Sequence, residues 1–99
     1  MTIYISGKIT GTEDFRERFA HAESKLKQQG WRVINPAKKN AHFPAGTSWE
    51  TYMRASIRLL SRADAIYLLR GWRDSRGARL EQQIAVALGM TIITQANGG

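Results

Sequence analysis

The amino-acid sequence predicts an α/β fold in which helices cover both faces of a four-stranded parallel sheet. Three observations lead to this prediction: short β-rich runs alternate with helical segments, the helical segments are amphipathic, and the 99-residue chain has room for one domain. Strands that alternate with helices are joined by right-handed crossovers, which makes neighbouring strands parallel. We therefore expect a single Rossmann-like domain over residues 1–99, with the flavodoxin-like strand order 2-1-3-4.

The first half of the chain supplies two strands and one helix. Residues 3–6 form a β-rich run that stops at Gly7, and residues 31–34 form the second such run. Between these runs, a glycine stop at Gly30 ends a predicted helix. Its apolar residues recur at helical spacing: Phe15, Phe19, Ala22 and Leu26.

The second half supplies two further helices, each followed by a strand. The first helix has the apolar stripe Trp49, Met53, Ile57 and Leu60. The second has the stripe Leu80, Ile84, Ala87 and Leu88, and Gly89 ends it. The strands are predicted over residues 65–69 and 91–94, and the chain after them is a polar tail.

The helix starts and the loops have their own signals. Two pairs stand in the spacing of a capping box and predict helix starts: Thr10 with Glu13, and Thr47 with Glu50. Residues 36–47 contain two prolines and a glycine, and residues 70–77 contain two glycines. Both segments are therefore predicted to be loops.

The composition narrows the classes of function. The absence of cysteine excludes disulfides, zinc–thiolate sites, iron–sulfur clusters and thiol catalysis. No apolar run approaches the roughly 18 residues of a membrane span, and residues 1–7 have a strand pattern rather than that of a signal peptide, so we expect a cytoplasmic protein without membrane association. The net charge of +7 favours an anionic partner. Nucleic acid is the less favoured candidate, because no nucleic-acid motif is present and the basic residues are spread along the chain.

Parallel sheets of this kind bind ligands beyond the carboxyl ends of their strands, so the chemistry is expected in the loops at that edge. The loop after the first strand contains a hydroxyl, glycines and a cation: Ser6, Gly7, Lys8 and Gly11. Free backbone N–H groups before a helix suit an anion. The alternative is an ordinary tight turn between strand and helix, and the loop alone does not decide between the two.

The loop before the last helix has a similar character. A serine, an arginine and a glycine precede the helix, and a carboxylate follows in its first turns: Ser75, Arg76, Gly77 and Glu81. At the open edge of the sheet, Glu81 is well placed to act as a nucleophile. The alternative is that Glu81 is an ordinary acidic residue near a helix start, which is common for structural reasons. Trp72 is placed to stack on a base or, equally, to pack on the sheet.

These segments resemble the nucleoside 2-deoxyribosyltransferase superfamily, and within it the DUF4406 family of phage and bacterial proteins. The resemblance rests on Ile-Tyr-Ile-Ser-Gly at residues 3–7, on Trp-Glu-x-Tyr-Met-Arg-Ala at residues 49–55, and on Ser-Arg-Gly-Ala-Arg-Leu-Glu at residues 75–81. It covers nearly the whole chain with the motifs in order. It implies a Rossmann-like sheet and cleavage or exchange of the N-glycosidic bond of a nucleoside or nucleotide.

The resemblance also implies roles for individual residues. The catalytic glutamate falls on Glu81, a tyrosine near the sugar falls on Tyr4, and a serine that binds phosphate or sugar falls on Ser75. A glutamate suits this chemistry because departure of the base leaves an oxocarbenium-like C1′, which a carboxylate traps or stabilises.

The sequence departs from the superfamily pattern at Ser56, where an aspartate commonly stands. A serine supplies neither the charge nor comparable acidity. Three interpretations remain open: a weak enzyme, an enzyme in which Asp74 serves as the second carboxyl, or a module that binds a nucleotide-derived ligand near Ser56 and Glu81 without turning it over.

No cofactor or metal is expected, because neither His21 nor His42 belongs to a metal-ligand pattern. Asp64 begins a strand at the opposite edge and is interpreted as structural, while Trp31 and Trp49 are interpreted as core or interface residues. The expected partner is a nucleoside, a nucleotide or a molecule derived from one. The resemblance also implies a homo-oligomer, and the small core of so short a chain agrees with that.

Overall fold

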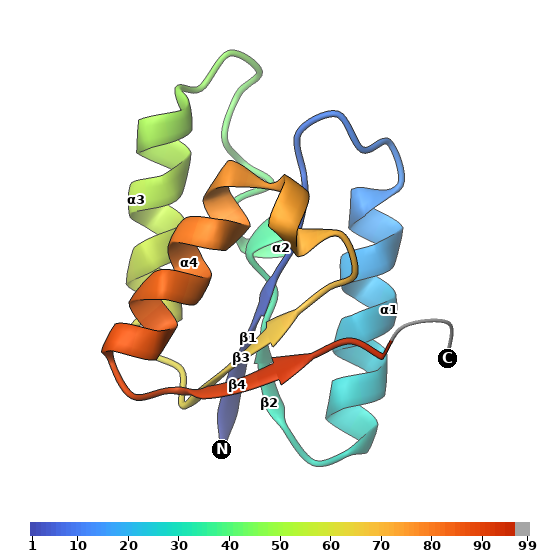
Figure 1. Ribbon diagram of the computed structural model, residues 1–99. Coiled ribbons are helices and arrows are strands. Elements are labelled where there is room, and N and C mark those ends of the chain that lie inside the picture. Colours follow the sequence, from blue (N-terminus) through green and yellow to red (C-terminus); the bar gives the residue numbers. More distant parts are fainter. Residues whose placement is uncertain (97–99) are drawn as a thin grey trace.

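The computed structural model describes residues 1–96 and contains a four-stranded parallel sheet of order β2-β1-β3-β4 (Figure 1). The strands are β1 (Thr2–Ser6), β2 (Arg32–Ile34), β3 (Ala65–Leu68) and β4 (Thr91–Thr94). All three neighbouring pairs are parallel, which confirms the predicted class and the predicted order. The end of the predicted polar tail, residues 97–99, lies outside the described residues.

Helices cover both faces of this sheet (Figure 1). They are α1 (Phe15–Gln28), α2 (Pro36–Lys39), α3 (Trp49–Leu60), the short 3₁₀ helix η1 (Trp72–Asp74) and α4 (Arg76–Ala87). Helix α1 packs on one face, while α3 and α4 pack side by side on the other. None of the helices in residues 1–96 has the length and apolar character needed to cross a bilayer.

The sheet separates two apolar cores, and β1 contributes to both. Its side chains alternate between the faces. Ile3 and Ile5 pack with Phe19 in the core beneath α1, whereas Tyr4 packs in the core beneath α3 and α4. Ser6 lies on the same face of β1 as Tyr4, so this alternation brings two hydroxyl groups to the α3–α4 side.

Two predicted loops contain short helices. Helix α2 lies within residues 36–47, and η1 lies within residues 70–77. Helix α2 begins where Pro36 follows Asn35, whose side chain accepts a hydrogen bond from the Lys38 N–H at 3.3 Å. This is the pairing of a side-chain cap with proline at the first helical position. A helix of four residues is too short to show apolar periodicity, which explains why the pattern missed it.

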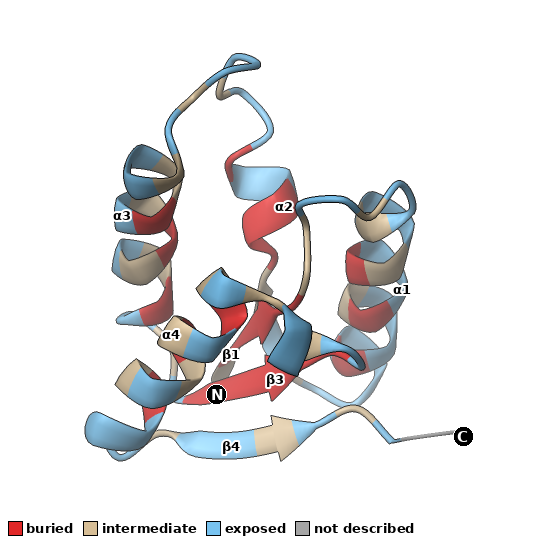
Figure 2. Cartoon of the chain, turned by 45° about the horizontal axis from the view of Figure 1, so that its top comes forward, coloured by how far each residue is buried: buried red, intermediate tan, exposed pale blue. Residues whose placement is uncertain are grey.

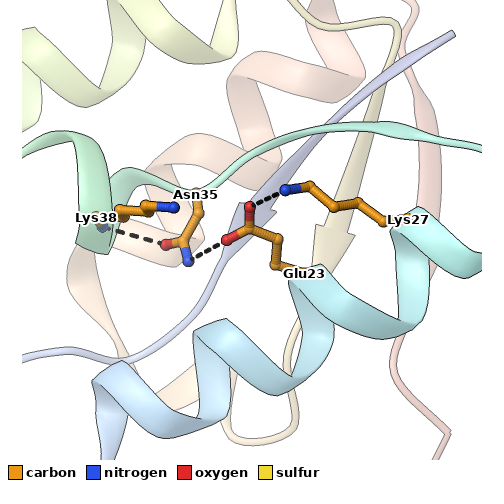
Figure 3. A network of polar contacts seen from close by, with 4 residues as sticks. All are labelled: Glu23, Lys27, Asn35 and Lys38. Carbon is orange, nitrogen blue, oxygen red and sulfur yellow. Dashed lines mark hydrogen bonds and ion pairs between the residues drawn. The ribbon is translucent and has the colours of Figure 1, made fainter.

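The cap of α2 is also tied to α1 (Figure 3). The Asn35 side-chain amide donates to the Glu23 carboxylate at 3.1 Å, and Glu23 forms an ion pair with Lys27 at 2.8 Å. Burial of Glu23 raises the pKa of this carboxyl, but the hydrogen bonds from Lys27 and Asn35 outweigh it and hold the pKa below its ordinary value. The network therefore fixes the position of α2 against α1.

Both predicted capping boxes are wrong. Helix α1 begins after Asp14 without a side-chain cap, and α3 is capped by Ser48, which accepts from the Thr51 N–H at 3.1 Å. Thr47 instead donates to the Pro44 carbonyl. The serine immediately beside the first apolar residue of the stripe provides the cap, one position later than the spacing suggested.

The buried stripe of α4 also differs from the predicted one. Ala78, Glu81 and Ala85 face the sheet, whereas Ala87 and Leu88 are exposed. The stripe was hidden in the sequence because two of its members are small and the third is charged. As a result Glu81 lies on the inner face of α4 rather than on its solvent side.

Candidate functional site

A cavity of about 240 Å³ opens beyond the carboxyl end of β1, between that strand and the facing sides of α3 and α4. Among the residues that line it are six from the sequence motifs: Tyr4, Gly7, Ser56, Ser75, Gly77 and Glu81. Much of the remaining wall is aromatic or apolar, including Ile9, Phe19, Pro36, Trp49, Tyr52 and Met53. A few polar groups among apolar walls are typical of small-molecule sites.

The carboxylate of Glu81 is the central polar group of this cavity. Glu81 is only 5% exposed, and each of its two carboxylate oxygens accepts a hydrogen bond. The Tyr4 hydroxyl donates to Oε2, and the Ser6 hydroxyl donates to Oε1 at 2.7 Å. Because both donors come from one face of β1, the pleat of a single buried strand fixes the orientation of the carboxylate.

The protonation of Glu81 follows from its burial. Loss of solvent raises the pKa of this carboxyl to about 7, while the hydrogen bonds from Tyr4 and Ser6 act in the opposite direction and only partly offset the burial. Near neutral pH both protonation states are therefore populated. A carboxyl in this range can act as a nucleophile or exchange a proton without a large energetic cost.

Tyr4 remains a hydrogen-bond donor over the same range of pH. Burial, and then the nearby charge of Glu81, raises the pKa of the Tyr4 phenol well above its ordinary value, although hydrogen bonding with Ser56 opposes this rise. The phenol therefore keeps its proton and continues to donate to the carboxylate.

Ser56 is held from the side of α2. The side-chain amide of Asn40, the residue that ends α2, donates to the Ser56 hydroxyl at 3.2 Å in a buried contact. Asn40 therefore holds Ser56 in the wall of the cavity that Tyr4 and Glu81 also line. These four residues come from four separate elements, so their arrangement depends on the fold being complete around the cavity.

The family model described as "Domain of unknown function (DUF4406)" matches residues 1–94. The chain belongs to the DUF4406 family. No match was found among functionally curated proteins. Among solved structures, the chain is similar to one described as a 2-deoxyribosyltransferase from the psychrotolerant bacterium Bacillus psychrosaccharolyticus, with a TM-score of 0.74 and 18% identity over 95% of this chain and 71% of that one. This likeness supports a nucleoside 2-deoxyribosyltransferase-like fold.

The first predicted anion loop contributes Gly7, Ile9 and Thr10 to the cavity wall, but not two of its other proposed residues. Lys8 and Gly11 are absent from the lining, and Gly11 has a φ of +76°, which a turn requires and which glycine adopts readily. Gly7 does line the cavity, yet a Cβ built there would meet the Leu69 side chain at 2.8 Å. The glycine at position 7 is therefore explained by close packing against Leu69.

Of the two residues proposed at the start of α4, Ser75 lines the cavity and Arg76 lies beside it. Ser75 caps the helix by accepting from the Ala78 N–H at 3.1 Å, and its residue lines the cavity. Arg76 lies outside the lining, with its guanidinium 3.7 Å from the centre of the Trp49 ring. A positive charge therefore lies beside the cavity, stacked on one of its aromatic walls.

Two residues proposed for the site from the sequence lie elsewhere. Asp74 is exposed on η1 and Trp72 packs against the core beneath α3 and α4, so neither lines the cavity. Gly71, with a φ of +83°, precedes η1 and makes the turn into it. Asp74 is thus not positioned as a second carboxyl, and the packing alternative for Trp72 is the one observed.

Sequence patterns missed several residues that line or support the cavity. Trp49 and Met53 belong to the stripe used to predict α3, and Tyr52 lies between them on the same side. Their spacing with Ser56 could have indicated a cavity wall, but the same spacing is typical of a core-facing helix. Asn40 had no signal at all, because its partner Ser56 is 16 residues away. Within residues 1–96 no cluster of three potential metal ligands is present.

Proposed function

We propose that this protein is an N-glycosidase or 2-deoxyribosyltransferase-like enzyme that acts on a nucleoside or nucleotide, with Glu81 as its nucleophile. The observation that supports the proposal best is the buried Glu81 carboxylate, oriented by two hydroxyl donors in a cavity at the carboxyl edge of the sheet. The fold that this chain shares with a 2-deoxyribosyltransferase agrees with it.

In the proposed reaction, one oxygen of the ionised Glu81 attacks C1′ of the sugar. The bond between C1′ and the base nitrogen breaks, its electron pair leaves with the base, and the base takes a proton from water. Water then displaces Glu81 from C1′ and releases the free sugar, or a second base displaces it and yields a new nucleoside. Either outcome regenerates the carboxylate, as in retaining glycosidases.

The other cavity residues suit the same substrate class. Trp49 and Tyr52 provide aromatic surface against which a base can stack. Arg76, stacked beside Trp49, supplies a cation for an anionic group of the ligand. Ser75 lines the cavity at the start of α4, and because its oxygen accepts from the Ala78 N–H, its hydroxyl proton can be donated to a ligand.

A second function is favoured by one observation: within residues 1–96, Glu81 is the only carboxylate that lines the cavity. The alternative is a module of the same fold that binds or senses a nucleotide-derived ligand without cleaving it. In this alternative the hydroxyls of Tyr4 and Ser6 keep Glu81 fixed as a hydrogen-bond acceptor for the ligand.

The substitution Ser56→Asp separates the two functions. A second carboxyl beside Tyr4 restores acid–base assistance, which commonly contributes about 10²–10⁴-fold, so base release should rise by a factor in that range. The matched control is Ser56→Asn, which adds similar volume without a carboxyl and should leave base release low. Free base is measured by chromatography after incubation with a panel of nucleosides and nucleotides.

The wild-type protein in the same assay completes the test. Base release by wild type that disappears in Glu81→Gln supports the enzyme, and shows that Ser56 suffices. No release by wild type or by Ser56→Asp, together with calorimetric binding of a nucleotide, supports the binding module. Neither release nor binding contradicts both.

A further inference from the structure

Charge is distributed very unevenly along the chain. All 15 Lys and Arg residues and all 8 Asp and Glu residues lie in residues 1–81, so residues 82–99 carry no charged side chain. The described part of this segment, residues 82–96, forms the second half of α4, the turn after it and β4, and we call it the neutral edge. In a protein with a net charge of +7, such a segment needs an explanation.

The neutral edge also holds most of the large apolar side chains that solvent reaches. Val86 is 56% exposed, Leu88 60% and Ile92 38%, and the other large hydrophobic residue in this class is Met1. Figure 2 shows exposed and intermediate surface along β4 and at the end of α4 where the chain turns into that strand. An exposed apolar group without charges is typical of a contact surface rather than of a solvated one.

Ile92 lies on the face of the sheet that α4 covers. Ile92 is the register partner of Ile66, and Ile66 packs in the core beneath α3 and α4. Because paired residues in neighbouring strands point to the same face, Ile92 points to the side on which α4 lies. The exposed Ile92 is therefore on the same side of the sheet as α4.

The backbone of β4 is available as well. The N–H of Thr91 donates to the Asp64 carbonyl at 3.1 Å, and the N–H of Gln95 donates to the Leu68 carbonyl at 2.8 Å. Peptide groups alternate in direction along a strand, so those of Ile92 and Thr94 point away from β3. Within residues 1–96 no strand pairs with that side of β4, which is the last strand of the sheet order.

We propose that the partner of this edge is a second copy of the chain. Two β4 strands pair antiparallel about a twofold axis through Ile93, so that Ile92 of one copy faces Thr94 of the other. The two four-stranded sheets then become one continuous eight-stranded sheet, with both α4 helices on the same face. This twofold contact is closed and does not propagate into a filament.

The charge distribution favours the neutral edge as the place where two copies come into contact. Two copies with a net charge of +7 repel each other, and the edge without charged side chains is where they approach at the lowest electrostatic cost. The edge also lacks the lysine, proline and bulge by which unpaired edge strands avoid association, whereas β2 at the opposite edge begins with the exposed Arg32.

The cavity lies over the carboxyl end of β1, so the contact leaves both cavities open, and the inference stands whether or not the protein is an enzyme.

Sedimentation equilibrium over a wide range of concentration tests the dimer. Wild type should associate, and association should strengthen with salt because salt screens the repulsion between the copies. Leu88→Lys places a charge on the neutral edge, and Thr94→Pro removes an outward N–H that no bond to β3 uses; each should reduce association at least tenfold. Ala20→Lys adds the same charge at an exposed position of α1 and should leave association unchanged.

Hydrogen exchange tests the same contact without a variant. The amides of Ile92 and Thr94 should exchange slowly at high protein concentration and rapidly at low concentration. Wild type that stays monomeric at every concentration, or an oligomer that both Leu88→Lys and Thr94→Pro leave intact, overturns the proposal. Amides of Ile92 and Thr94 whose exchange does not depend on concentration also overturn it.

Discussion

The two faces of β1 differ in chemistry although they belong to the same five residues. Toward α1, Ile3 and Ile5 pack among apolar side chains. Toward α3 and α4, Tyr4 and Ser6 present hydroxyls that hold the buried carboxylate of Glu81. The difference shows how alternation along one buried strand separates a face that stabilises the fold from a face that orients a reactive group.

The largest effect is expected from the polar face. Glu81→Gln keeps the shape of the side chain but removes the nucleophile, so base release should fall about 10⁴-fold or more. Nucleotide affinity should change little, because the variant retains Trp49 and Arg76, the residues proposed to contact the base and the anionic group. Chromatography of free base and calorimetry measure the two quantities; equal loss of release and affinity would instead indicate a role in binding alone.

A substitution on the apolar face of β1 should lower stability and leave base release unchanged. Ile3→Ala removes a fully buried side chain beneath α1, which should lower the free energy of unfolding by about 2–5 kcal/mol. Base release per folded molecule should stay near the wild-type value, since Ile3 does not line the cavity. Urea denaturation followed by circular dichroism measures the free energy of unfolding. Base release per folded molecule is measured at urea concentrations below the unfolding transition.

The buried carboxyl also predicts a dependence of stability on pH. Burial raises the pKa of Glu81 from 4.5 to about 7, so between these values the unfolded chain loses its proton while the folded protein keeps it. Stability therefore falls as pH rises through this window, by about 3 kcal/mol from this group. Glu81→Gln lacks the effect, so its stability relative to wild type should rise from pH 4 to pH 8.

This difference is measured by urea denaturation of both proteins at each pH. Wild type and Glu81→Gln with parallel profiles would show that the carboxyl titrates alike in the folded and unfolded chain. That result would remove the physical basis for a carboxyl poised near neutrality.

The smallest effect is expected at the strand end where the two faces meet. A Cβ at Gly7 would lie 2.8 Å from the Leu69 side chain, so Gly7→Ala forces Leu69 to move. We expect a loss of about 1–3 kcal/mol in the free energy of unfolding, with no loss of nucleotide affinity per folded molecule. A loss of affinity without a loss of stability would show that Gly7 is needed by the ligand rather than by packing.

The sheet was predictable from the sequence because its signals are local. Alternation of β-rich runs with apolar helical stripes indicated four parallel strands, and handedness then restricted their order. The position of Glu81 after the Ser75–Gly77 turn placed it at the carboxyl edge of the sheet. The structure confirms the fold and the order, while the catalytic role of Glu81 is a proposal.

The parts that were not predictable depend on contacts between distant segments. Helix α2 is too short for periodicity, and its Asn40 reaches Ser56 only because the network around Asn35 ties α2 to α1. The inner stripe of α4 contains alanines and a glutamate, which no apolar pattern detects. Asp74 was expected near the cavity from its loop position, but the turn at η1 directs it to solvent.

The most direct test of the central claim is the intact mass of the protein after incubation with a nucleoside whose sugar bears fluorine at C2′. The fluorine disfavours positive charge at C1′ and slows release of the sugar from the carboxylate. A protein in which Glu81 is the nucleophile should gain the mass of one fluorinated sugar, and peptide mapping should locate that mass on Glu81. Base release by wild type without any such adduct, or an adduct on another residue, would contradict the assignment.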